Sequence, residues 1–183
     1  MIPATRIAGG RLGLVADTHD ELVDWGTVLP RIAAALAGVD GILHCGDLTS
    51  AEALAGLHEI APVLAVRSPA DPEEAPPELV DGPRLVEAGE LMIGLVNTLA
   101  GPPVGAQTDP VLGFPELPAA EVGPEVFGRP VQVVVFGGSH VACLASAGGV
   151  LFVNPGSPSL AKTLTVGLLE VHGSVATPRI LRL

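Results

Sequence analysis

Apolar and polar positions in the first third of the chain form short blocks that predict strands and helices in alternation. Apolar runs at 11–16, 41–44 and 63–66 have the length of buried strands, and each of them ends at polar residues. Two stretches with helical character separate these runs. The alternation of strand and helix predicts βαβ units, and therefore a parallel sheet.

The two intervening helices are marked by the residues at their ends. Pro30 suits an early helical position, so we expect the first helix to continue from it through an alanine-rich run and to stop at Gly38. Thr49 or Ser50 can cap the second helix, which we expect to reach about His58.

Beyond residue 84 the pattern changes to that of β-hairpins. Strands are expected at 84–88 and 91–96, on either side of a two-residue turn. The segment 97–128 is rich in proline and glycine; a short helix is expected near 118–127, and the remainder forms either a lid or a loose surface loop. The later strands are expected at 131–136, 141–146, 149–153, 164–171 and 174–181.

The length of 183 residues suits a single domain, 1–183, with a sizeable core. Together with the pattern of elements, it predicts an α/β fold built as a four-layer αββα sandwich of two mixed β-sheets. The chain is 48% hydrophobic, but no stretch approaches the roughly 18 consecutive apolar residues of a membrane span. The N-terminus has no extended apolar segment of the secretory kind. We therefore expect a cytoplasmic protein without a membrane partner.

The charge balance bears on the choice of partner. The formal net charge is −11, and only nine residues are lysine or arginine. A nucleic-acid binder carries clustered basic residues that neutralise phosphates, and this sequence has no such cluster, so no nucleic-acid partner is expected. Seven acidic residues lie between Asp71 and Glu90, where we expect a solvated loop.

Polar side chains with metal-binding chemistry follow the predicted strands. Asp17 and His19 come directly after the first strand, Asp47 follows the second, and His140 follows the strand predicted at 131–136. In open α/β sheets, ligands bind outside the carboxyl ends of the strands. Asp17 and His19 alone would be read as a polar turn. With Asp47 and His140 added, we favour a divalent cation site that can polarise a phosphoryl group.

The order of these motifs resembles that of the calcineurin-like metallophosphoesterases, and most of all their small prokaryotic phosphodiesterase branch. The resemblance runs from about Arg11 to the C-terminus and implies that Asp17, His19, Asp47 and His140 hold the first metal of the family. The motifs that carry it are, in order, Asp17-Thr18-His19, Gly46-Asp47, the loop at 67–71, Gly137-Gly138-Ser139-His140 and Asn154-Pro155-Gly156-Ser157.

The second metal site of the family is incomplete in this sequence. It shares Asp47 and adds an asparagine and two histidines, whose positions align with Pro69, Asn97 and Gly138. Proline and glycine have no side-chain donor, whereas Asn97 can offer a carbonyl oxygen. The resemblance therefore implies one divalent transition metal (Mn, Fe or Zn) and no second metal.

Two functions remain open from the sequence. The first is weak, mononuclear hydrolysis of a small phosphate ester, either a diester or a monoester. In it Asp47 and His140 act through the metal, and Arg67, at a position where the family commonly has arginine, holds phosphate and partly replaces the missing cation. The alternative is an inactive scaffold or ligand-binding protein, as in the retromer scaffold subunit, which resembles the same fold. The Asn154–Ser157 turn either closes the sheet beside this site or directs backbone N–H groups at an anion. The oligomeric state is left open.

Overall fold

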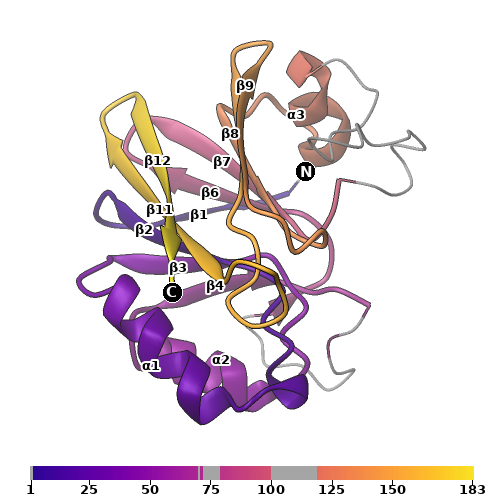
Figure 1. Cartoon of the computed structure of the whole chain (residues 1–183). Helices are drawn as coiled ribbons and strands as arrows, with labels where there is room; N and C mark the ends of the chain where they lie inside the picture. Colours follow the sequence, from indigo (N-terminus) through magenta and orange to yellow (C-terminus); the bar gives the residue numbers. More distant parts are fainter. Residues whose placement is uncertain (1, 70, 72–78, 100–118) are drawn as a thin grey trace.

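The computed structural model describes residues 2–69, 71, 79–99 and 119–183, which form two six-stranded mixed sheets (Figure 1). In the first sheet, β2, β3, β4 and β5 are parallel, and the antiparallel pair β11 and β12 extends it beyond β2. The order across this sheet is β12-β11-β2-β3-β4-β5. Its strands are β2 (Arg11–Val15), β3 (Gly41–His44), β4 (Val63–Val66), β5 (Leu79–Val80), β11 (Thr165–His172) and β12 (Val175–Arg182).

The second sheet is built mainly from the middle of the chain. Its order is β1-β6-β7-β8-β10-β9, with β6 antiparallel to β7, and β7 and β10 both parallel to β8. Its strands are β1 (Ala4–Arg6), β6 (Arg84–Ala88), β7 (Leu91–Val96), β8 (Val133–Phe136), β9 (Cys143–Ala147) and β10 (Val150–Asn154).

Helices cover the outer faces of both sheets. The helices α1 (Trp25–Ala35) and α2 (Ala51–His58) pack on the first sheet, and α3 (Ala119–Phe127) packs on the second. A short 3-10 turn, η1 (Asp20–Leu22), follows β2. The inner faces of the sheets share a core that includes Leu14 and Leu43 from one sheet and Ile93 and Val135 from the other. This arrangement confirms the predicted four-layer αββα sandwich.

Helix α1 differs from the prediction at its start. It begins at Trp25, five residues before Pro30, which lies inside the helix. Proline in a helix interior removes one backbone hydrogen bond. The apolar stripe Trp25, Val28 and Ile32 continues at helical spacing across Pro30 and packs on the first sheet. Tertiary burial of this stripe therefore outweighs the lost hydrogen bond.

Other sequence expectations can be compared element by element. Ser50 caps α2 as predicted, because its side chain accepts hydrogen bonds from the N–H groups of Glu52 and Ala53. The short strands β1 and β5 were not predicted. The segment 100–118, where a lid or loop was expected, lies outside the described residues. Within those residues, no helix has the length and apolar character needed to cross a membrane.

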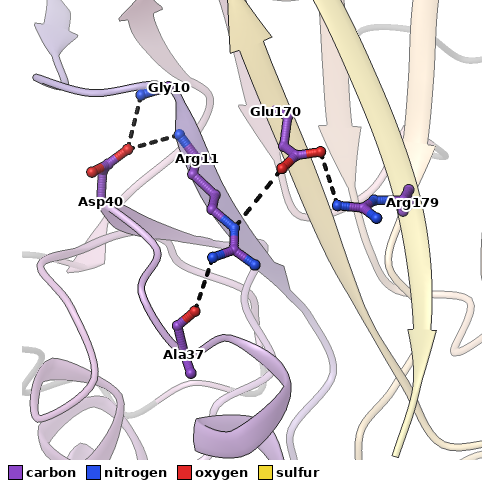
Figure 2. A network of polar contacts seen from close by, with 6 residues as sticks. All are labelled: Gly10, Arg11, Ala37, Asp40, Glu170 and Arg179. Atoms are coloured by element: carbon purple, nitrogen blue, oxygen red, sulfur yellow. Dashed lines mark hydrogen bonds and ion pairs between the residues drawn. The ribbon is translucent and has the colours of Figure 1, made fainter.

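A polar network ties the start of β2 to its neighbours, as Figure 2 shows. The N–H groups of Gly10 and Arg11 both donate to Asp40 Oδ2 at 2.8 Å, and Arg11 Nη1 donates to the carbonyl of Ala37 at 3.1 Å. Glu170 on β11 lies 4.0 Å from Arg11 Nε and 2.8 Å from Arg179 Nη2. This network lies at the amino-terminal end of β2, and thus leaves the carboxyl edge of the sheet free for the candidate site.

Candidate metal centre

Four loops meet at the carboxyl ends of β2, β3, β7 and β8. Backbone hydrogen bonds join them directly: Asp17 N donates to Gly46 O at 3.1 Å, His19 N to Asp47 O at 2.9 Å, and Gly137 N to Asn97 O at 2.8 Å. Because the strands are parallel neighbours within each sheet, the residues that follow them are delivered to one edge of the sandwich.

Asp17 is fully buried and joins the first loop to the last. Its Oδ1 accepts a hydrogen bond from Gly138 N at 2.8 Å, and its Oδ2 accepts one from His140 N at 3.1 Å. Burial raises the pKa of Asp17 to about 6, although the Gly138 N–H and the charge of His140 act in the opposite direction. The carboxyl group is thus held beside His140 from a position more than one hundred residues away in the sequence.

The imidazoles of His19 and His140 face each other, with their Nε2 atoms 3.2 Å apart. His140 Nδ1 lies 2.9 Å from the carbonyl oxygen of Leu160. That carbonyl can only accept, so Nδ1 carries the proton and, in the neutral ring, Nε2 presents its lone pair. Fixing a histidine tautomer through the other ring nitrogen is the usual support for a metal-binding histidine.

Asp47 lies next to both Asp17 and Asn97. Asn97 Nδ2 donates to Asp47 Oδ2 at 3.2 Å and to the carbonyl of Cys45 at 2.7 Å. Burial opposes ionisation of Asp47, but hydrogen bonds from Ser68, Asn97 and Asp17 outweigh it, so the pKa of Asp47 is lowered. Asp47 is therefore ionised at neutral pH. Asn97 supports it through the amide nitrogen.

The backbone of the candidate ligands is in an uncommon conformation. Within the described residues, five non-glycine residues have positive φ, and four of them are Asp17, His19, Asp47 and His140, with φ of 54°, 41°, 58° and 58°; the fifth is Thr49, with 71°. The left-handed region costs an ordinary residue about 1 kcal/mol or more, and such strain clusters at functional sites. The four residues chosen from sequence motifs are thus set apart by backbone geometry as well.

The comparisons with known proteins identify the family. The sequence matches the calcineurin-like phosphoesterase superfamily domain over residues 11–174. This chain belongs to that family. A probable metallophosphoesterase of Methanocaldococcus jannaschii is 29% identical over 157 residues, which make up 84% of this chain and 72% of that protein.

Two solved structures have the same fold as this family member. Vps29 of Chaetomium thermophilum has a TM-score of 0.69 at 20% identity, with 96% of this chain and 97% of that chain covered. A protein described as a novel archaeal phosphodiesterase has a TM-score of 0.65 at 19% identity, with 93% and 99% covered. At these identities the likeness concerns the fold alone. Vps29 and the archaeal phosphodiesterase both have this fold.

Asp71 is a structural member of the site that the sequence analysis missed. The acidic pattern of the sequence predicts a solvated loop here, but Asp71 is 8% exposed, so that prediction is wrong for this residue. Its carboxylate accepts hydrogen bonds from the N–H groups of Asp47, Leu48, Thr49 and Ser68. The signal available in the sequence was Ser68-Pro-Ala-Asp71, a turn closed at both ends: Ser68 N donates to Asp71 Oδ2 at 2.7 Å, and Asp71 N donates to the Ser68 carbonyl at 3.2 Å.

His44 lies beneath the same loop and is fully buried at the end of β3, the strand predicted at 41–44. Gly46 N donates to His44 Nδ1 at 3.1 Å, so the proton of the neutral ring is on Nε2, which lies 3.5 Å from Thr18 Oγ1. Burial lowers the pKa of His44 to about 4, against the charges of Asp71 and Asp47. His44 thus stays neutral at physiological pH and braces the loop that carries Asp47.

The turn Asn154–Ser157 fastens two of the converging loops. Asn154 Nδ2 donates to Gly137 O at 3.4 Å and to Ser139 Oγ at 3.1 Å. Ser157 Oγ donates to Asp17 O at 2.7 Å. These contacts agree with the first of the two roles considered for the turn, in which it closes the sheet beside the candidate site. Asp17 and the Gly137–His140 segment are positioned through it.

The remaining predicted residues lie around the same edge. Arg67 directly follows β4, and its Nε is 3.3 Å from Asp81 Oδ1, so part of its charge is balanced by a carboxylate. Pro69 is exposed. Gly138 has φ of +81°, and a Cβ added there would lie 3.3 Å from Thr98 Cβ. The catalytic role of Arg67 and the ligand role of Asn97 stay predictions.

The donors agree with a divalent metal in kind and in part of their geometry. Two imidazole nitrogens bound to one tetrahedral ion at about 2.0–2.1 Å lie roughly 3.3 Å apart, close to the 3.2 Å between His19 and His140. However, no three His, Cys, Asp or Glu side chains of the described residues form a group that could hold a metal as they stand. Both oxygens of Asp17 accept backbone N–H groups instead. Metal binding therefore requires at least one carboxylate to come within reach of an ion at the imidazole pair.

Proposed function

We propose that this protein is a metal-dependent phosphoesterase that works with one divalent transition metal, held by Asp17, His19, Asp47 and His140. The family membership supports the reaction class. The observation that carries the proposal is that these four residues share left-handed backbone conformations at one edge of the sandwich. Strain of this kind persists where the surrounding structure and function require it.

In this proposal, each side chain of the site has a separate role in hydrolysis. A divalent cation bound here would supply Lewis acidity towards a phosphoryl oxygen. Asp47, whose pKa is lowered, and Asp17 contribute negative charge to hold the cation. His140, with Nδ1 bonded to Leu160 O, directs the lone pair of Nε2 into the site. Arg67 could bind a phosphate oxygen if its guanidinium leaves Asp81.

We further propose that the second metal site of the family is lost in this chain. Pro69 and Gly138 have no side-chain donor atom, and Asn97 uses its amide nitrogen to support Asp47. In two-metal enzymes the ions stabilise the attacking and the leaving oxygen together. A single ion lacks this double action, so turnover is expected to be far below that of a complete relative.

The test is hydrolysis of a model phosphodiester, bis-p-nitrophenyl phosphate, by purified protein that has been treated with chelator and reloaded with Mn²⁺, Fe²⁺ or Zn²⁺. Asp47→Asn should reduce the rate by at least about 100-fold, because it removes a charged ligand. Asp24→Asn, a change of the same kind at an exposed position before α1, serves as the control. Equal rates for wild type and Asp47→Asn would overturn the proposal.

A catalytically inactive scaffold is the second candidate function. It is favoured by the two erased ligand positions, Pro69 and Gly138, and by the fold shared with Vps29. Metal content separates the candidates at the level of binding. A protein that retains no Mn²⁺, Fe²⁺ or Zn²⁺ after reloading and hydrolyses neither phosphodiesters nor phosphomonoesters would support the scaffold.

A further inference from the structure

A pocket of about 330 Å³ opens directly beside His140. One wall is formed by His140 and Val141, which follow β8, and another by Lys162 and Thr163, which precede β11. The end of β12 completes it with Ile180 and Arg182. This volume is at the lower end of that of small-molecule sites. The pocket shares His140 with the candidate metal centre, so the two sites are immediate neighbours.

The direction of the side chains on β12 follows from strand alternation. Leu181 and Leu183 pack against the core between the first sheet and its helices. Ile180 and Arg182, at the alternate positions, are therefore on the opposite face, where they line the pocket. The end of the strand is held in place, because Leu183 N donates to Leu164 O at 3.0 Å and Arg182 pairs with Thr165 in the register of β11 and β12.

The charge of the pocket is unlike that of the protein as a whole. The chain has a net charge of −11, yet Lys162, the single lysine in the sequence, and Arg182 both line this pocket. Among the residues that the structure describes, no aspartate or glutamate lines it. Within the described part of the chain, neither Lys162 nor Arg182 forms an ion pair, whereas Arg6, Arg11, Arg67 and Arg179 each pair with a carboxylate.

A second cavity shows that a pocket lined by cations without carboxylates is not general in this protein. The cavity beside the β6–β7 turn also contains two arginines, Arg6 and Arg129, but Glu87 and Glu90 line it as well. Its positive charge is thus balanced internally, and Arg6 is paired with Glu87 at 3.4 Å. The pocket beside His140 combines unpaired positive charge with a position next to the candidate metal centre.

We propose that Lys162 and Arg182 form a subsite for a second anionic group of the substrate. The preferred substrate class is then a small organic phosphate that carries a further phosphate or carboxylate group. Charge-assisted hydrogen bonds from the two cations bind this group. Val141 and Ile180 provide apolar contact for the carbon skeleton between the two anions. The inference rests on the proposed function of the neighbouring site.

The first experiment compares three aryl phosphates with metal-loaded protein: phenyl phosphate, its para-carboxy derivative and hydroquinone bisphosphate. Lys162→Gln and Arg182→Gln should each raise KM about five- to tenfold for the two compounds with a second anion. The KM for phenyl phosphate, and kcat for all three, should change less than about twofold. The carboxylate and bisphosphate compounds show which second anion the subsite prefers.

The matched control is Arg31→Gln, which removes one positive charge from an exposed position on α1 that does not line the pocket. It should leave KM unchanged for every compound. A rise in KM that is equal for phenyl phosphate and its anionic derivatives, or that also occurs in Arg31→Gln, would show a general charge effect and overturn the subsite.

A binding experiment keeps the subsite testable if wild type hydrolyses none of the compounds, an outcome that would count against the proposed function. Calorimetric titration of the chelator-treated protein should show that hydroquinone bisphosphate binds at least about fivefold more tightly than phenyl phosphate. The double variant Lys162→Gln/Arg182→Gln should abolish this preference, while Arg31→Gln should retain it. Equal binding of both compounds to wild type would refute the proposed subsite.

Discussion

At the scale of single residues, the site depends on side chains whose backbone is strained. Asp17, His19, Asp47 and His140 all have positive φ, which few L-residues adopt, although aspartate and histidine do so more often than most. Asparagine tolerates this region better than histidine does. The strain at these positions can therefore be relieved by a change that also removes a candidate ligand, so stability and metal binding should respond in opposite directions.

The variant His19→Asn tests this trade-off. The metal-free protein should gain up to about 1 kcal/mol in unfolding free energy, because the left-handed backbone becomes less costly. Its affinity for Mn²⁺ should fall at least about tenfold. Chemical denaturation and metal titration measure the two effects. His58→Asn, at an exposed helix end with ordinary backbone, should change neither, and a loss of stability in His19→Asn would contradict the strain argument.

The buried imidazole of His44 makes stability depend on pH. Its pKa is lowered from 6.5 to about 4 by burial. As pH falls below 6.5, the unfolded chain binds a proton that the folded chain does not bind until about pH 4, so stability is lost over this window. With ~1.4 kcal/mol for each tenfold change in proton affinity, the loss from this group is about 3 kcal/mol.

Asp17 opposes this trend, because its pKa is raised from 3.8 to about 6. The folded state binds that proton more tightly, so this group contributes stability that is lost as pH rises from 3.8 to 6. The metal-free wild type should therefore show a nearly flat unfolding free energy between pH 4 and 6. His44→Gln should expose the Asp17 trend, with stability falling as pH rises. Denaturation curves at several pH values measure both slopes, and a His44→Gln protein whose stability rises with pH would contradict this assignment.

At the scale of elements, buried side chains accept hydrogen bonds from the backbone of the loops that follow the strands. Asp71 accepts the N–H groups of three consecutive residues, 47–49, and of Ser68. Asp20 accepts from the hydroxyl of Thr49 and from the N–H of Ser50. Loops of this kind can hold strained ligands, since each backbone donor has a defined partner.

Asp71→Ala should lower the unfolding free energy by about 3 kcal/mol, because it leaves four backbone donors without their carboxylate. Hydrogen exchange at residues 47–49 should accelerate more than elsewhere in the molecule. The control is Asp81→Ala, which removes an exposed aspartate paired with Arg67 and should cost less than about 0.5 kcal/mol. Similar losses for the two variants would show that burial of Asp71 does not matter.

At the scale of the whole molecule, the two sheets bring residues from distant parts of the sequence to one edge. Asp17 at the end of β2 accepts from His140 beyond β8, and its carbonyl accepts from Ser157 after β10. An ion bound at this edge therefore joins both sheets. Because it binds the folded chain and not the dispersed ligands of the unfolded one, it should stabilise the entire fold.

Thermal unfolding with and without Mn²⁺ measures this coupling. At a metal concentration about 100 times the Kd, the stabilisation should be about 2.7 kcal/mol, with a single cooperative transition. Asp17→Asn should show little or no response to Mn²⁺. An unchanged melting temperature in wild type on metal addition would argue against the proposed metal centre and favour the scaffold.

The local pattern of apolar and polar residues predicted some helices and strands well and others poorly. Strand runs such as 41–44 and 63–66 were identified because burial on both faces leaves a short apolar block. The start of α1 was predicted too late, because Pro30 gave a stronger local signal than the apolar stripe that packing uses. Strands β1 and β5 are two or three residues long and are defined by their partners.

The sequence by itself determined the order of most elements, the family and the chemical identity of the candidate ligands, because periodicity and side-chain chemistry are local properties. Only the tertiary structure decided how these ligands meet. The tautomer of His140 depends on the carbonyl of Leu160. Asp71 is buried because it accepts hydrogen bonds from the loop above it. Lys162 and Arg182 line one pocket because the register of β11 and β12 brings them together. These contacts join residues remote in sequence, and their partners exist only after the sheets have packed.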